Sequence, residues 1–125
     1  MIEALITHLI TDPGVTALNG DRVYPDVAPE GLDTSIIITR ITSTGERLTT
    51  GVMTSRLSIF QIDIRSFTRK TTDDIASQVL STLDNLSGTI GGKKFDRALF
   101  DSDRDDYESD MKRFLNSMTF YIYHY

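Results

Sequence analysis

Hydrophobic positions near the start of the chain follow a helical period. In residues 2–10 the apolar side chains recur every three or four positions, so they share one face of an amphipathic helix. These side chains are Ile2, Leu5, Ile6, Leu9 and Ile10. Pro13 and Gly14 end this helix. Asp12 is a suitable N-cap, and Pro13 a suitable first residue, for a short second helix that closes at Asn19-Gly20.

Two later stretches have the pattern of strands. Residues 35–44 (SIIITRITST) are rich in β-branched side chains, and residues 54–67 alternate between two faces. One face of the second stretch carries Ser58, Phe60, Ile62 and Ile64, and the other carries Leu57, Ile59, Gln61, Asp63 and Arg65. The intervening GERLTTGV is therefore predicted to be a long hairpin loop.

The helical period returns after the second strand. Thr71 or Thr72 is predicted as an N-cap, because Asp73 and Asp74 then fall in the first turn, near the positive end of the helix dipole. Gly88 is suited to the position just after the last turn. The apolar stripe consists of Ile75, Ala76, Val79, Leu80, Leu83 and Leu86.

Two more strands are predicted, around residues 94–100 and over residues 111–125, with the acidic residues 101–110 as the turn between them. The order of elements is α-(α)-β-β-α-β-β. No strand-helix-strand alternation is long enough to demand a parallel sheet. We therefore expect an α+β fold in a single domain, residues 1–125, with a mainly antiparallel four-stranded sheet and the helices packed on one face.

Charge is concentrated in one place. The window DSDRDDYESD, residues 101–110, contains six acids and one arginine, and its net charge of −5 equals that of the whole chain. With so few clustered lysines and arginines, nucleic acid is a poor candidate partner.

The opening segment has no basic leader and no apolar run long enough to span a bilayer, so neither export nor a membrane partner is expected. The chain has no cysteine, which suits folding inside a cell.

Candidate catalytic and metal sites fail on their spacing. The acidic window places aspartates at the first, third and fifth positions of an EF-hand loop, but Asp106 stands where glycine is needed and Lys112 where glutamate is needed. A solvated acidic turn is the simpler interpretation, and adventitious divalent binding remains an alternative. The segment SGTIGGKKF does not match a phosphate-binding loop, and neither His8 nor His124 is tied to a nucleophile. No catalytic residue, metal ligand or cofactor is predicted.

The most specific segment is ALNGDRVYPDVAPEG, residues 17–31, between the N-terminal helices and the first long strand. Together with SIIITRIT, LSIFQIDIRSFT, DDIASQVLSTLDNL and the closing aromatic strand, it resembles the phage tail-completion, or tail-terminator, family. In that family a similar G-x-R-[VI]-[YF]-P run precedes the first strand. The similarity covers nearly the whole chain.

This resemblance implies a virion structural protein and not an enzyme. It implies a ring, commonly of six copies, that caps the finished tail tube, ends its growth and offers the surface for head attachment. The implied partners are further copies of the chain, the tail tube protein, and a head-closure or connector protein. The expected location is the head-proximal end of the tail, after synthesis in the bacterial host cytoplasm. Two alternatives remain open: another neck component, and a metal-dependent hydrolase that uses the acidic window.

Two segments are hypothesised to form protein interfaces. Pro25 and Pro29 lower the entropy cost of holding the apolar side chains of their loop against the core or a neighbouring subunit. The loop from Gly45 to Met53 is longer than a tight hairpin needs, and we expect it to be mobile in the free subunit and ordered on assembly. The candidate interface residues are Val23, Tyr24, Val27, Glu46, Arg47, Leu48, Val52 and Met53.

Overall fold

The computed structural model of the protein describes residues 2–29, 31, 33–47, 53–90, 92–110 and 112–124. The first two predicted helices are confirmed as α1 (Ile2–Thr11) and α2 (Pro13–Asn19). Asp12 caps α2 through a hydrogen bond that its side chain accepts from Val15 N, at 3.0 Å, and Gly20 ends the helix with a positive φ of 63°. These capping residues are adjacent to the helix in the sequence, so the ends of the helix can be predicted from the sequence alone.

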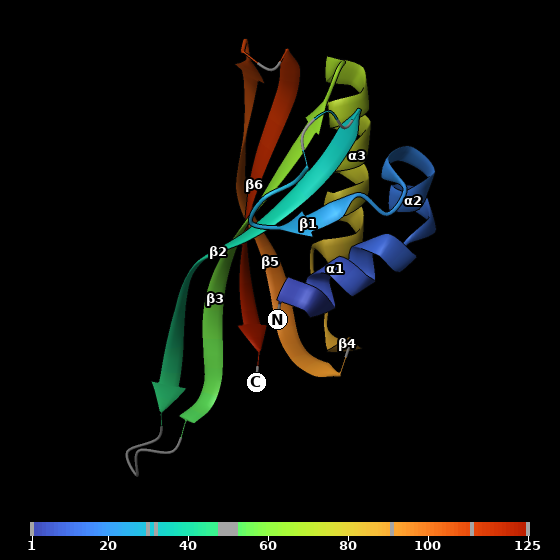
Figure 1. The fold of residues 1–125 in the computed structure, drawn as a ribbon. Helices are drawn as coiled ribbons and strands as arrows, with labels where there is room; N and C mark the ends of the chain where they lie inside the picture. The colour runs from blue at the N-terminus through green and yellow to red at the C-terminus, as the bar shows by residue number, and fades with distance from the viewer. Residues whose placement is uncertain are drawn as a thin grey trace.

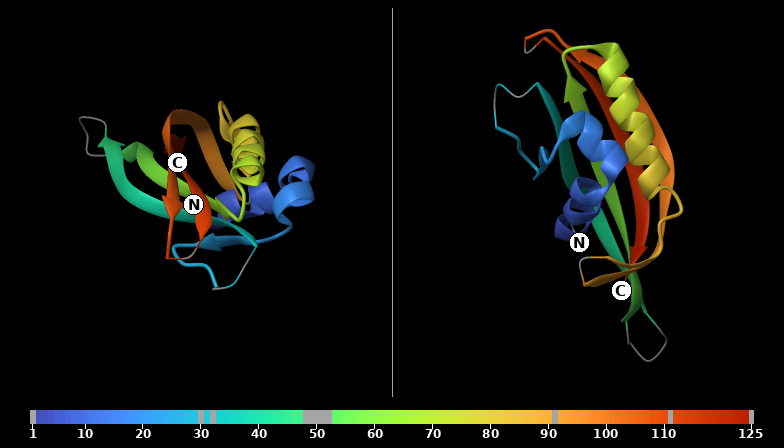
Figure 2. Two further views of the ribbon diagram at one scale, coloured as in Figure 1. Left: turned by 90° about the horizontal axis from the view of Figure 1, so that it is seen from above. Right: turned by 90° about the vertical axis from the view of Figure 1, so that its right-hand side faces the viewer.

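Within the described residues six strands form one sheet, so the predicted mainly antiparallel four-stranded sheet is wrong. The order across the sheet is β1-β2-β3-β6-β5-β4, in which β1 and β2 are parallel and the other pairs antiparallel. The sheet curls into a half-barrel (Figures 1 and 2). The strands are β1 (Val23–Pro25), β2 (Thr34–Arg47), β3 (Met53–Ser66), β4 (Gly88–Ile90), β5 (Lys93–Glu108) and β6 (Arg113–His124).

The two unpredicted strands are each three residues long and form the two margins of the sheet. Three residues are too few to show alternation, and β1 contains Pro25, which is tolerated in strands chiefly at edges. β1 also changes the class of the sheet. It pairs with β2 in parallel, Val23 opposite Ile36 and Pro25 opposite Ile38, so the sheet is mixed.

The three helices of the described residues lie on one face of the sheet (Figure 2). The core between the helices and the sheet contains the predicted even-numbered side chains of β3, and Phe60, Ile62 and Ile64 are fully buried. The helices contribute Ala4, Leu5, Leu9, Val15, Ile75, Ala76, Val79 and Leu83. Since the helical and strand periods each place their apolar residues on this side, no helix or strand of the described residues covers the opposite face of the sheet.

The third helix, α3 (Arg69–Leu83), begins earlier than predicted. Its N-cap is Thr68, whose Oγ1 accepts a hydrogen bond from Thr71 N at 3.2 Å, so neither Thr71 nor Thr72 is the cap. At the other end the cap is Asp84, and Gly88 belongs to β4. Thr68, Thr71 and Thr72 are each suitable as an N-cap by residue type, and tertiary contacts decide among them. Here the Thr72 hydroxyl lies 2.6 Å from Ser66 Oγ at the end of β3.

The acidic window is not the predicted turn. Residues 101–108 continue β5 and pair with β6 from Ser102 opposite Thr119 to Glu108 opposite Arg113. Aspartate is depleted in strands, which explains the wrong prediction. Hydrogen bonding between β5 and β6, together with the exposure of the aspartate side chains to solvent, outweighs the low strand preference of aspartate. The hairpin turn lies after Glu108.

The predicted hairpin between the first two long strands exists, but its strands are longer than expected. β2 continues through Gly45, Glu46 and Arg47, and β3 begins at Met53. The two strands project beyond the rest of the sheet as an arm (Figure 1). Residues 48–52, on which part of the predicted interface falls, lie outside the described residues.

Candidate interaction surfaces

The loop that contains Pro25 and Pro29, which we call the proline loop, has three candidate interface residues. One of them lies in the core, and the other two are closer to the surface. Val23 is 5% exposed and belongs to the core. Tyr24 is half-buried, and Val27 is 77% exposed. Asp26 N donates to Ile38 O at 3.0 Å, which holds the loop beside β2 as far as Ile38. Of this set, Val27 is the side chain that most clearly faces outward.

Arg22 anchors this loop to the start of β2. Its Nε donates to Thr34 O at 3.1 Å, and its Nη2 donates to Thr34 Oγ1 at 2.8 Å. The carbonyl of Arg22 accepts from Ile36 N at 3.0 Å and from Asn19 Nδ2 at 3.0 Å. One residue therefore fixes α2, β1 and β2 relative to one another, which gives the arginine of the GDRVYP segment a structural role.

The remaining candidate interface residues belong to the β2–β3 arm. Glu46 and Arg47 end β2, and Met53 begins β3, while Leu48 and Val52 lie outside the described residues. The proline loop pairs with residues 36–38 near the other end of β2. The two predicted interface segments therefore occupy different parts of the molecule and do not form one site.

The uncovered face of the sheet has an apolar part and a polar part. Leu57, Ile59, Tyr121 and Tyr123 are half-buried on it and lie in neighbouring rungs of β3 and β6. Farther along the same strands, Asp63 Oδ1 accepts from Ser117 Oγ at 2.7 Å and from Gln61 Nε2 at 2.9 Å.

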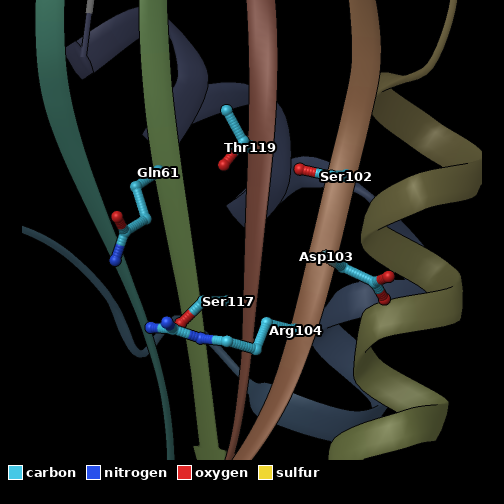
Figure 3. Close-up of a pocket in the computed structure, with 6 residues that line it drawn as sticks. All are labelled: Gln61, Ser102, Asp103, Arg104, Ser117 and Thr119. Atoms are coloured by element: carbon cyan, nitrogen blue, oxygen red, sulfur yellow. The ribbon is translucent and has the colours of Figure 1, made fainter.

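A shallow hollow of about 300 Å³ lies in the polar part of this face. Arg104 extends from β5 across β6 toward Ser117, whereas Asp103 points to the opposite side, toward α3 (Figure 3). The hollow is lined by Gln61, Ser102, Asp103, Arg104, Ser117 and Thr119. It is a wide, open surface and not an enclosed pocket, so it suits contact with a protein better than capture of a small molecule.

An aromatic and arginine cluster, which sequence reasoning missed, lies at the end of the sheet opposite the β2–β3 arm. The guanidinium carbon of Arg113 is 3.6 Å from the ring centre of Phe67, and that of Arg69 is 5.0 Å from the ring centre of Phe114. Tyr107 packs against Phe114 with ring centres 4.8 Å apart. Phe67 and Tyr107 are about half exposed, at 49% and 47%. Aromatic residues and arginine are enriched at protein interfaces.

The acidic strand supports no metal site. Asn116 Nδ2 donates to Asp105 Oδ1 at 2.9 Å and to Asp103 Oδ2 at 3.2 Å, and Arg69 pairs with Asp105 at 3.1 Å. Within the described residues, no group of three or more histidine, cysteine, aspartate or glutamate side chains could hold a metal ion. The carboxylates are held instead by donors of the protein itself.

Neither histidine has the setting of a catalytic base. His8 Nε2 lies 2.9 Å from Thr82 Oγ1, a contact between α1 and α3. His124 Nε2 lies 2.8 Å from Ser58 Oγ, but Ser58 is fully buried and His124 is 4% exposed. A substrate has no access to that serine, so the pair holds β3 and β6 together. In the described part of the chain, no helix is both long and apolar enough to cross a membrane.

Comparison with known proteins gives a family match and a fold match. Residues 3–125 match the family described as tail completion protein gp17. A search of curated proteins finds no match. Among solved structures, the fold is similar to that of a chain in the virion of a native gene transfer agent particle. The TM-score is 0.83 at 17% sequence identity, and the match covers 99% of this chain and 93% of that one.

Proposed function

Since the chain belongs to the tail completion protein gp17 family, we propose that it caps the tail tube as a ring, ends tube growth and forms the surface for head attachment. The family match over residues 3–125 carries this proposal. The match extends over every described helix and strand apart from Ile2, the first residue of α1. The chain is a structural component of a virion, and its interactions are with other virion components.

The surface of the subunit agrees with a role in contacts. Exposed apolar and aromatic side chains occur in separate regions: Val27 and Ile41 on the β1–β2 side, and Phe67 and Tyr107 at the end opposite the arm. A closed ring needs two different patches on each subunit for its lateral contacts, and a cap between tube and head needs two axial surfaces. We propose six copies in the ring, with the tail tube protein and a head-closure or connector protein as the axial partners.

The proposed place of the protein is the head-proximal end of the tail, after synthesis in the host cytoplasm. Another neck component, either a head-closure or a connector protein, would have a similar size and similar contacts. The two roles differ in what is lost without the protein. Absence of a terminator leaves tube length uncontrolled, whereas absence of a head-closure protein leaves tails of normal length that do not join heads.

The test is therefore a particle assembly made without this chain, observed by negative-stain electron microscopy. We expect tails of irregular length and heads without tails. Adding the purified chain during assembly should restore both uniform length and joining. Tails of normal length in its absence would assign the protein to the neck instead.

A further inference from the structure

Both margins of the sheet leave a stretch of strand edge unpaired. β1 covers β2 only from Ile36 to Ile38, and among the described residues no strand pairs with that side of β2 farther along. Residues 40–42 and 44–45 are exposed. Ile36 N and Ile38 O point toward β1, and outward-pointing groups recur at every second residue, so Arg40 continues this row. We call residues 39–45 the β2 edge.

The opposite margin is open over a similar length. β4 and the segment before it bond β5 as far as Phe100, whose N donates to Asp84 Oδ1 at 3.0 Å. Farther along, Arg69 Nη2 donates to Asp106 O, and Tyr107 N donates to Asp106 Oδ1. Between these contacts lie residues 101–105, which are all exposed. We call them the β5 edge.

The two edges have opposite charge. Arg40 is the single charged residue of the β2 edge, and within the described residues it has no ion-pair or hydrogen-bond partner. The β5 edge carries Asp101, Asp103 and Asp105 against Arg104. Two β5 edges would repel each other, which is a common protection against self-pairing of edge strands. A β5 edge and a β2 edge attract.

Exposed apolar or aromatic side chains lie near both edges: Ile41 and Val27 near the β2 edge, and Tyr107, 47% exposed, two residues beyond the β5 edge. Ile41, at a bulge in β2, is 55% exposed, and Val27 is 77% exposed just beyond the last residue of β1. An open edge with adjoining apolar surface is a site where another strand adds to a sheet. The β2 edge therefore places apolar side chains that a neighbour would cover beside backbone groups that it would bond.

We propose that the β2 edge of one subunit pairs with the β5 edge of a second copy of this chain, so that neighbouring sheets join. The contact uses two different surfaces at opposite margins of one sheet, which is the head-to-tail arrangement that a closed ring requires. This inference rests on the ring proposed above and assigns its lateral interface. Arg40 faces the aspartates of the neighbour, and Val27 and Ile41 are covered.

Cysteine cross-linking tests the pairing directly, because the natural chain has no cysteine. Thr42 and Ser102 are exposed and lie on the uncovered face of the sheet in their respective edges. The variant with both Thr42→Cys and Ser102→Cys is added to tails, its occupancy of tail ends is checked by electron microscopy, and a short bismaleimide is then applied. We expect a ladder of linked species that ends at six copies.

Each single-cysteine variant alone should give no linked dimer, whereas a mixture of the two should give dimers and nothing larger. The pair Ala17→Cys and Ser102→Cys, with one thiol on α2, is the matched control and should give no ladder. Arg40→Glu should lower the yield of linked species about tenfold, since like charges then meet. Adding Asp101→Arg and Asp103→Arg to Arg40→Glu should restore the yield of linked species. The single substitution Arg97→Glu should leave that yield unchanged.

The outcomes separate this inference from the proposed function. Capped tails with reactive thiols but no ladder would overturn the edge pairing and leave the terminator role intact. Dimers formed by one single-cysteine variant would overturn the head-to-tail arrangement. Failure of the natural chain to occupy tail ends would overturn the proposed function, and the ring interface with it.

Discussion

The guanidinium of Arg22 holds Thr34, the first residue of β2, through both the carbonyl and the hydroxyl of that threonine. The contact joins the proline loop to the sheet. We expect Arg22→Ala to lower the free energy of unfolding by about 1–3 kcal/mol, because it removes charge-assisted hydrogen bonds at a partly buried position. Urea denaturation followed by circular dichroism measures the change.

The matched comparison is Arg22→Lys, which keeps the charge but not the forked donor geometry. It should recover only part of the lost stability. Arg97→Ala, at an exposed position on β5, is the control for loss of an arginine and should change stability little. Equal stability of the Arg22→Ala variant and the natural chain would contradict the anchoring role.

The acidic strand should tolerate neutralisation. We expect the variant with Asp103→Asn, Asp105→Asn and Asp106→Asn to keep its fold and to change unfolding free energy by less than about 1 kcal/mol. In the ion pair of Asp105 with Arg69 the Asp105 side chain is 60% exposed, and ion pairs that reach solvent contribute little. An asparagine oxygen can also accept from Asn116 Nδ2. Loss of cooperative thermal unfolding in this variant would show that these carboxylates are structural.

We expect the aromatic and arginine cluster to contribute more to contacts with other virion components than to the stability of the fold. Phe67→Ala removes a half-exposed ring at the surface, so thermal stability should change little, while occupancy of tail ends or joining to heads should fall at least about tenfold. Tyr107→Phe keeps the neighbouring ring and should behave as the natural chain does. Normal assembly by the Phe67→Ala variant, counted in electron micrographs, would remove this cluster from the interfaces.

The arm between β2 and β3 gives a prediction about assembly. We expect backbone amides of residues 46–52 to exchange with deuterium more slowly in assembled tails than in the free subunit, since β2 and β3 project beyond the rest of the sheet, where a partner in the tail can contact them. The buried amides of Ile62 and Ile64 serve as an internal reference and should exchange slowly in both states. Equal exchange of residues 46–52 in both states would mean that the arm contacts nothing in the tail.

Helices and long strands could be predicted from the sequence because their signals repeat. The stripe from Ile2 to Ile10 and the alternation from Leu57 to Arg65 each extend over several periods, and both are confirmed. The three-residue strands β1 and β4 have no such repeat. Their existence depends on pairing with residues that are near in space, as Val23 is with Ile36.

The acidic strand shows a second limit of predicting structure from this sequence. Composition alone predicts a turn for residues 101–108, and the pairing with β6 makes them a strand. Among the candidate interface residues, sequence pattern could identify the loop that carries Val27 but could not tell that Val23 is turned into the core. The cluster of Phe67, Arg113, Tyr107 and Phe114 comes from three separate segments, so no local pattern indicates it.

Cryo-electron microscopy of isolated tails can show whether this chain caps the tail tube. We expect density for this chain at the head-proximal end of the tube, as a single ring of six copies. A ring of six in which the β2 edge faces the β5 edge of the next copy would support the lateral interface as well. Density for the chain only at the portal, or none on the virion, would show that the chain does not cap the tail tube.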